Sequence, residues 1–195
     1  MRIVLKKIMA VTLCLVMLTA SVIALVPKEI SDVSAANYVT GDNSVSSSYK
    51  GSIYYKNFSR VPITGDARTD VVAVALSQLG YQEGNSSSDL DGIGMGYNNY
   101  TEYNENIWGA SVLGTEFYWC ASFVSWALLQ SGATDHNSSQ DMVRYNKGDS
   151  EYIWREIACG TWAYQLNRFG YFRYSKYHGG SYIPQGGDLI YYSWS

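Results

Sequence analysis

Cysteine and histidine are scarce in this sequence. The 195 residues include three cysteines and two histidines. Cys14 lies in an apolar N-terminal run, which leaves Cys120 and Cys159 for the folded part of the chain. A small secreted domain held together by disulfides uses more cysteines than this, so that class of protein is excluded. A single Cys120–Cys159 disulfide stays open as an alternative.

Positive charge is also low. The formal net charge is −3, and the first 36 residues hold four of the 14 basic residues and two of the 17 acidic ones. Removal of those residues would leave a net charge of about −5. Proteins that bind nucleic acid or other anionic polymers need a basic surface, so the sequence argues against such partners.

Metal-binding patterns are incomplete. The segment "DLDGIG" contains Asp89 and Asp91, which is typical of the start of a calcium loop. The bidentate acid that closes an EF-hand loop is missing at its usual spacing. We therefore expect Asp89 and Asp91 to be solvated turn residues, with a calcium site as the alternative, and we expect no metal and no cofactor.

The N-terminus has the pattern of a signal peptide. Arg2, Lys6 and Lys7 precede an apolar run over residues 8–26, and small residues follow in "SDVSAANY". This pattern predicts that residues 1–36 are a secretory signal peptide that is removed, so the mature protein is extracellular. An uncleaved membrane anchor is the alternative, although the run is near the lower length limit for a membrane span. We expect membrane contact only through the signal peptide before cleavage.

Residues 37–64 are rich in Ser, Gly, Asn and Tyr and show no sustained period, which predicts a linker or a loosely ordered arm. A helix is expected next, in "DARTDVVAVALSQLG" at residues 66–80, with Thr64 or Asp66 as its cap and Gly80 as its stop. Its expected buried stripe consists of Val71, Val72, Ala75, Leu76 and Leu79.

The remaining elements are predicted from composition and period. Residues 81–114 are dense in Gly, Asn, Ser and Asp, which predicts one long loop whose aromatic residues (Tyr97, Tyr100, Tyr103 and Trp108) pack on the domain. The segments "SEYIWREIACG" and "TWAYQLNRFG" both predict short helices, the second beginning near Thr161 and ending at Gly170.

The last segment, "YIPQGGDLIYYSWS", predicts a turn followed by a buried strand from Leu189 to Trp194. A strand cannot satisfy its backbone groups alone. We therefore expect the sheet to continue beyond Ser195, which makes residues 65–195 one domain that is incomplete at the C-terminus. A coil or helix over 191–194 is the alternative.

Cys120 is the candidate reactive residue. It lies near the start of a predicted helix over Phe117–Gln130, which ends at Gly132 and carries large apolar residues on its other faces. Free N–H groups and the helix dipole at this end favour a thiolate, which is the reactive form of cysteine. The alternative is that Cys120 is a buried packing residue, as free cysteines commonly are.

Four motifs, in this order and spacing, resemble the CHAP family (cysteine, histidine-dependent amidohydrolase/peptidase). They are "VALSQLGYQEGN", "YNENIWGASVLG", "FYWCASFVSWALLQSGA" and "YIPQGGDLIYY". The segment "WCASFVSWA" is similar to the nucleophile helix of that family. The resemblance covers residues 67–195 and implies an α+β, papain-like fold. In that fold a helical N-terminal half carries the nucleophile helix, which packs on an antiparallel sheet, here mostly missing from the chain.

The resemblance also implies a reaction. The family hydrolyses amide bonds in peptidoglycan, as an N-acetylmuramoyl-L-alanine amidase or as an endopeptidase, and its members are associated with the cell wall. By this resemblance Cys120 is the nucleophile, its backbone N–H contributes to an oxyanion hole, and a thioester forms. Tyr118 and Trp119 are candidates for substrate contact, and Glu83 is expected to hold the long loop.

The chain departs from the family at the general base. The family histidine follows the Gly-Asp strand, and neither His136 nor His178 matches that position. Without its base such a cysteine loses on the order of 10² to 10⁴ in rate, so we expect this polypeptide to be nearly inactive. A non-catalytic wall- or glycan-binding module that uses the tyrosine-rich loop is the alternative. Cys159 is expected to be structural, and the oligomeric state is not indicated.

Overall fold

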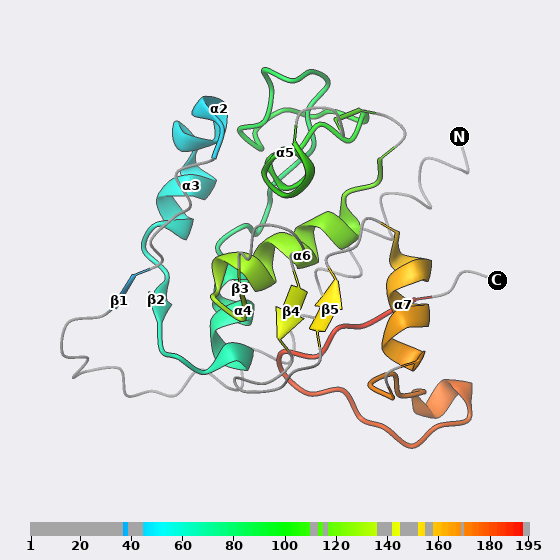
Figure 1. The fold of residues 1–195 in the computed structure, drawn as a ribbon. Coiled ribbons are helices and arrows are strands. Elements are labelled where there is room, and N and C mark those ends of the chain that lie inside the picture. The colour runs from blue at the N-terminus through cyan, green and yellow to red at the C-terminus, as the bar shows by residue number, and fades with distance from the viewer. Residues whose placement is uncertain are drawn as a thin grey trace. The chain divides into compact units, whose positions relative to one another are not determined.

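The structure is a computed structural model that describes residues 37–38, 45–109, 113–114, 117–135, 142–144, 152–154, 158–168 and 170–192. Its helices are α2 (Ser47–Lys50), α3 (Ile53–Phe58), α4 (Ala67–Leu76), α5 (Glu102–Trp108), α6 (Cys120–Gln130), α7 (Cys159–Arg168) and the 3₁₀ helix η2 (Lys176–His178) (Figure 1). Within the described residues no helix is long and apolar enough to cross a membrane. The predicted signal peptide lies outside them.

Two small antiparallel sheets accompany the helices. Strand β1 (Asn37–Tyr38) pairs with β2 (Pro62–Ile63), and β3 (Thr134–Asp135), β4 (Met142–Arg144) and β5 (Tyr152–Trp154) form the second sheet in that order. Each strand is two or three residues long. The described part of the chain is therefore mostly helical, which agrees with the helical N-terminal half of the expected α+β fold.

Helix α4 forms where the sequence predicts it. Asp66 is its N-cap, and the Asp66 carboxylate accepts a hydrogen bond from the Thr69 N–H at 2.8 Å. The buried residues of α4 are, however, Asp70 and Val74, and Gln78 is buried just after the helix ends. The predicted stripe is wrong at Leu79, which is 49% exposed. The stripe was drawn from apolar residues alone, whereas this helix buries polar side chains whose partners lie elsewhere in the chain.

The buried polar residues of α4 and of the segment just after it, Asp70 and Gln78, have hydrogen-bond partners. Asp70 accepts from the N–H and the hydroxyl of Thr64, both at 2.8 Å, and from the Gly65 N–H at 2.9 Å. Gly65 has a φ of +87°, a conformation that favours glycine. Gln78 Oε1 accepts from the hydroxyls of Tyr49 and Tyr103. Each bond removes the desolvation penalty that an unpartnered polar group would carry in the core.

The main hydrophobic cluster surrounds Trp126 of α6, which is fully buried. The ring centroids of Phe58 and Tyr103 lie 5.1 Å from that of Trp126, and the centroid of Tyr49 lies 6.2 Å away. Aromatic pairs at these separations stabilise a core beyond their buried area. Tyr49 and Phe58 come from α2 and α3, so the predicted loosely ordered arm is corrected over residues 45–63. Its aromatic residues find partners distant in sequence, which composition alone does not reveal.

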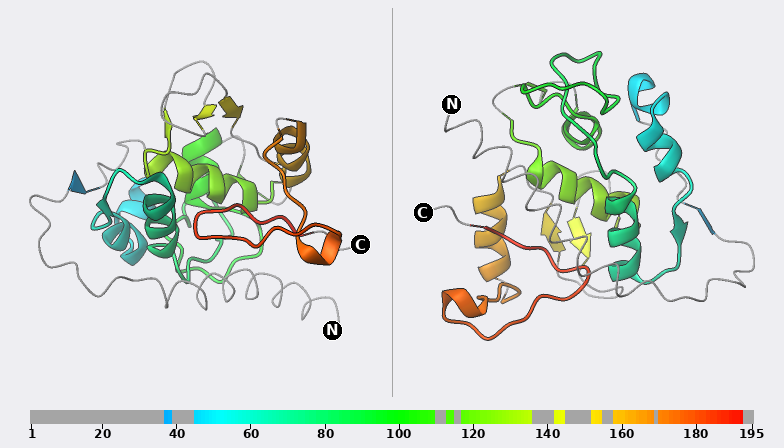
Figure 2. Two further views of the ribbon diagram at one scale, coloured as in Figure 1. Left: turned by 90° about the horizontal axis from the view of Figure 1, so that it is seen from below. Right: turned by 180° about the vertical axis from the view of Figure 1, so that it is seen from behind.

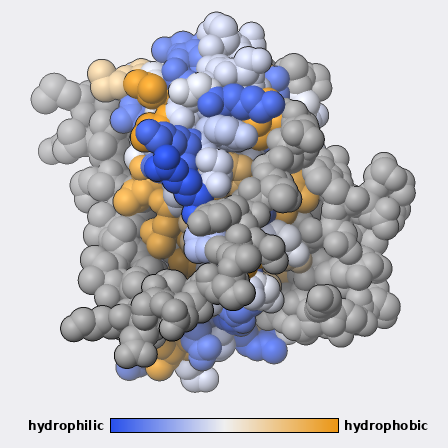
Figure 3. Space-filling model, turned by 90° about the vertical axis from the view of Figure 1, so that its left-hand side faces the viewer, coloured by the Kyte–Doolittle hydropathy of each residue, from blue (hydrophilic) through white to orange (hydrophobic). Residues whose placement is uncertain are grey.

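The outward side of α2 and α3 carries both charged and apolar side chains. Lys50, Ile53 and Lys56 are exposed there, while Tyr49 and Phe58 on the opposite side are buried. In the view of this side, strongly hydrophilic residues cross the middle of the surface and apolar ones lie beside them (Figure 3).

The predicted long loop contains helix α5. Thr101 caps it by accepting the Asn104 N–H at 3.2 Å. Tyr103 of this helix is fully buried, as expected for a packing aromatic, whereas Tyr97 is 75% exposed. The many polar residues of α5 hid the helix from an argument based on composition, because Glu102 and Asn104 are themselves buried.

A second cluster lies on another face of α6. Ala121 packs there with Trp162 and Leu166 of α7, and partly buried side chains surround them: Val124, Leu128, Tyr171, Phe172 and Tyr191. Helix α7 begins at Cys159, two residues before the predicted start, and the chain turns at Gly170, where φ is +78°. The predicted helix over "SEYIWREIACG" is wrong at residues 152–154, which pair with β4 instead. β-branched and aromatic residues in Tyr152–Trp154 suit that pairing.

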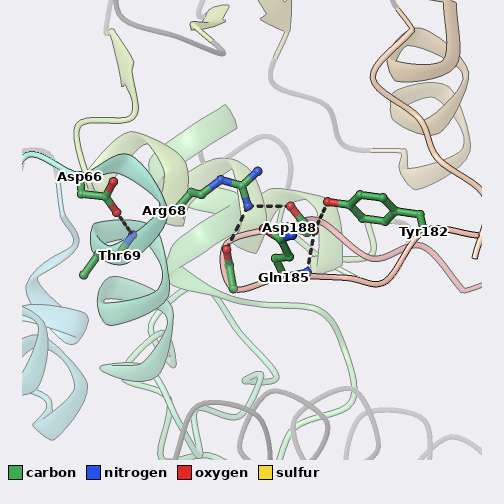
Figure 4. A network of polar contacts seen from close by, with 7 residues as sticks. Asp66, Arg68, Thr69, Tyr182, Gln185 and Asp188 are labelled. Carbon is green, nitrogen blue, oxygen red and sulfur yellow. Dashed lines mark hydrogen bonds and ion pairs between the residues drawn. The ribbon is translucent and has the colours of Figure 1, made fainter. Parts of the chain in front are cut away.

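The C-terminal segment is tied to the start of α4. Arg68 Nη1 donates to Asp188 Oδ1 at 2.8 Å and to the Gly186 carbonyl at 3.0 Å. The other Asp188 oxygen accepts from the Tyr182 hydroxyl at 2.7 Å and the Gln185 N–H at 2.8 Å (Figure 4). Partial burial acts to raise the pKa of Asp188, but these bonds lower it overall.

The predicted terminal strand is absent from its described residues. Residues 189–192 have no strand structure, and Leu189 and Ile190 are exposed. Among the described residues, no strand pairs with residues 189–192, and an unpaired segment does not form a strand. Residues 193–195 of the predicted strand lie outside the described residues.

Glu102 generates a prediction on stability. It is fully buried and accepts hydrogen bonds from the N–H and hydroxyl of Ser46. Burial raises the pKa of Glu102 to about 7, although the Ser46 bonds lower it. As pH rises, the Glu102 carboxyl of the unfolded chain loses its proton near pH 4.5, whereas the folded chain keeps this proton until about pH 7. The free energy of unfolding should therefore fall by up to about 3 kcal/mol between these pH values.

Glu102→Gln should therefore flatten the fall in the free energy of unfolding over this pH range, as measured by urea denaturation from pH 4.5 to 8. Glu105→Gln, on the less buried side of α5, is the matched control and should keep most of the slope. An unchanged slope in Glu102→Gln would contradict the assignment.

Candidate functional site

The start of α6 leaves backbone donors open. Trp119 is the N-cap residue, and its side chain makes no capping hydrogen bond. The N–H groups of Cys120 and Ala121 at this helix start lower the pKa of the Cys120 thiol. Cys120 is the first residue of the helix, so its sulfur lies among N–H groups that have no partner within the helix.

The Cys120 sulfur also contacts Cys159. The Cys159 thiol donates to it, and this bond is the largest cause of a Cys120 pKa near 6. Partial burial acts in the opposite direction. The pKa of Cys159 is raised, because its proton is held by the Cys120 thiolate. Both cysteines are free and exposed, so the disulfide left open by the sequence is not formed in this structure.

The two cysteines meet because two helices begin side by side. Cys120 is the first residue of α6 and Cys159 the first residue of α7. Both views from the front and from behind show these helix starts next to each other (Figures 1 and 2). The contact of Ala121 with Trp162 and Leu166 in the second cluster holds them there.

Trp119 and Glu83 position the segment that leads into Cys120. The indole N–H of Trp119 donates to Glu83 Oε2 at 2.8 Å. The Trp119 ring lies 5.7 Å from that of Tyr103 and 6.3 Å from that of Phe123. Trp119, which the sequence predicts as a substrate contact, therefore anchors the residue before Cys120 to the main cluster.

Glu83 holds the loop as well, as the sequence led us to expect. Its carbonyl accepts the Gly96 N–H at 2.8 Å. A Cβ on Gly96 would lie 2.4 Å from that carbonyl oxygen, so glycine is required for this close approach. Tyr118, the other predicted substrate contact, is 66% exposed next to the site.

The histidines do not join Cys120 among the described residues. His178 lies on the exposed helix η2, and His136 lies outside the described residues. The groups that shift the Cys120 pKa are Cys159 and the backbone of residues 120 and 121. Sequence reasoning missed the role of Cys159 because that residue was assigned to the end of a predicted helix, which hid its position at the start of α7.

The acidic loop shows no metal cluster. Asp89 accepts the Asn85 N–H at 3.1 Å and Asp91 accepts the Ile93 N–H at 3.0 Å, which are bonds typical of turns. Within the described ranges, no group of three or more His, Cys, Asp or Glu side chains could hold a metal ion.

The thiol pair predicts a pH profile for alkylation. Iodoacetamide reacts with thiolates, so the rate at Cys120 should rise with pH through a midpoint near 6. Cys159→Ala removes the thiol donor and should move this midpoint toward the ordinary cysteine value of about 8.5. Cys159→Ser keeps a hydroxyl donor, so its alkylation midpoint should lie between those of the wild type and of Cys159→Ala. Mass spectrometry of the Cys120 peptide from pH 4 to 9 measures the rates, and a midpoint unmoved in Cys159→Ala would contradict the assignment.

The Trp119–Glu83 bond predicts a stability loss. Trp119→Phe keeps a ring but removes the bond to a charged acceptor, which should lower the free energy of unfolding by about 1–2 kcal/mol. The matched control is Trp108→Phe, which removes a bond to the neutral Ser122 hydroxyl and should lose about 0.5–1 kcal/mol. Urea denaturation followed by circular dichroism compares them, and equal losses would show that the Glu83 charge adds nothing.

Comparison with known protein families, with curated proteins and with solved structures gave no match for this chain. The resemblance to the CHAP family therefore rests on the motifs quoted from the sequence.

Proposed function

We propose that this chain is the catalytic part of a secreted peptidoglycan hydrolase that cleaves amide bonds through Cys120. The observation that carries the proposal is an exposed thiol at the first residue of α6 whose pKa is lowered to about 6. A group with that pKa is mostly thiolate at neutral pH. The resemblance of "WCASFVSWA" to a nucleophile helix supports the same residue.

The proposed reaction is acyl transfer. The Cys120 thiolate attacks the carbonyl carbon of the amide, and the carbonyl π electrons move to oxygen. The N–H of Cys120 would donate to this oxyanion. The C–N bond then breaks, the amine leaves with a proton from a general acid, and a thioester remains. Water attacks the thioester, releases the acid and restores the thiol.

The papain-like form of the fold and the base belong to this proposal. By the resemblance, the base is a histidine that comes after the Gly-Asp strand, a position that neither His136 nor His178 matches. A cysteine that acts without this base loses on the order of 10² to 10⁴ in rate, because the base also protonates the leaving amine and activates the water.

A wall- or glycan-binding module is the second candidate. Exposed tyrosines favour it, because a tyrosine ring stacks on sugar or peptide faces at low entropic cost. They include Tyr97, Tyr118, Tyr164 and Tyr174. This activity would not require the thiol of Cys120.

Purified peptidoglycan distinguishes the two functions. The wild-type chain should acquire a muropeptide mass on the Cys120 peptide and release new amino or muramoyl groups slowly. Cys120→Ala should abolish both effects and keep binding to walls in a sedimentation assay. Full hydrolysis by Cys120→Ser would show that the nucleophile is wrong. Wall binding without acylation or release in the wild type would favour the binding module.

A further inference from the structure

In the proposed hydrolysis Cys159 serves only as a hydrogen-bond donor that lowers the pKa of Cys120, although its own side chain is a second thiol. We propose that Cys120 and Cys159 form a redox-active dithiol that low-molecular-weight disulfides convert into an intramolecular disulfide, which closes the nucleophile. The effect on hydrolysis rests on the proposed function, whereas formation of the disulfide does not.

The geometry brings two free thiols together from separate helices. Cys159 donates to Cys120 across the junction of α6 and α7. The second cluster packs directly behind the pair, through Ala121 next to Cys120 and Trp162 one turn beyond Cys159. Both thiols are exposed, so a small disulfide in solution can reach them.

The electrostatics assign different roles to the two residues. The pKa of Cys120 is lowered by the Cys159 thiol and by helix N–H groups, so Cys120 is the thiolate that attacks first. The raised pKa of Cys159 keeps its proton until the Cys120 sulfur has been capped and no longer holds a negative charge. Cys159 is then the resolving residue.

The exchange balances in two steps. The Cys120 thiolate attacks one sulfur of a disulfide RSSR; the S–S bond breaks, one RS⁻ leaves, and a mixed disulfide forms on Cys120. Cys159 then loses its proton to solvent, and its thiolate attacks the Cys120 sulfur and displaces the second RS⁻. Two protein thiols are oxidised and one RSSR is reduced to two thiols. The disulfide product has no thiolate that could attack a carbonyl. An added dithiol reduces this disulfide and restores both thiols.

The test uses the purified full chain with oxidised glutathione as the probe. After quenching with iodoacetamide, peptide mass mapping should find the Cys120 and Cys159 peptides joined with the loss of two hydrogens, and dithiothreitol should separate them. A lasting glutathione adduct on Cys120 in the wild type would overturn the proposal. A cross-link from Cys120 to Cys14 would also overturn it.

Two variants sharpen this result. Cys159→Ser should stop at the glutathione adduct on Cys120. The matched control is the double variant Cys159→Ser, Thr161→Cys, which keeps the number of thiols but moves one by about 200° around α7. It should also stop at the adduct, and cross-linking as fast as in the wild type would refute the assigned geometry.

Activity is a separate measurement. If oxidised glutathione stops acylation of Cys120 by walls and dithiothreitol restores it, the disulfide regulates the proposed enzyme. If the disulfide forms but the wild type never becomes acylated by walls, the proposed function fails and the dithiol stands. If acylation persists after full cross-linking, the proposed closing of the nucleophile is wrong.

Discussion

The packing of α6 on two sides is the constraint on which the rest of this structure depends. Trp126 fills the centre of the main cluster, and Ala121 on another face contacts α7. A helix packed on both sides has its rotation and position determined, because a small turn would break contacts on each. Cys120, the first residue of that helix, is therefore presented in one orientation.

Polar side chains complete what apolar packing begins. Gln78 bonds two tyrosine hydroxyls inside the main cluster, and Glu83 bonds the indole N–H of Trp119. The strands are too short to supply many backbone bonds between segments, so side-chain bonds connect parts of the chain that lie far apart in sequence. Such buried networks specify one arrangement of a core, provided that every member has its partner.

The sequence predicted elements whose signal is local. Helix α4 follows from its cap at Asp66, and helix α6 follows from its apolar faces and the stop at Gly132. The order of residues 45–63 was missed, because Tyr49 and Phe58 are buried by partners far along the chain. The terminal strand was predicted wrongly at residues 189–192, because strand structure depends on pairing with another segment.

The candidate site, too, has features that the sequence predicted and features that it did not. The position of Cys120 at a helix start could be predicted from its neighbours. Its contact with Cys159 could not, because 38 residues lie between the two and the contact depends on how α7 docks. The roles of Glu83 and Trp119 were predicted separately, while the bond that joins them is visible only in three dimensions.

The unequal size of the two clusters gives the site a local stability of its own. Counted over the described residues, the main cluster has ten buried residues, whereas the second has three, of which α7 supplies Trp162 and Leu166. A smaller interface opens at a lower free energy than global unfolding. Each opening of α7 removes the Cys159 donor, and Cys120 then titrates as a more ordinary thiol. The nucleophilicity of the site is thus coupled thermodynamically to the docking of one helix.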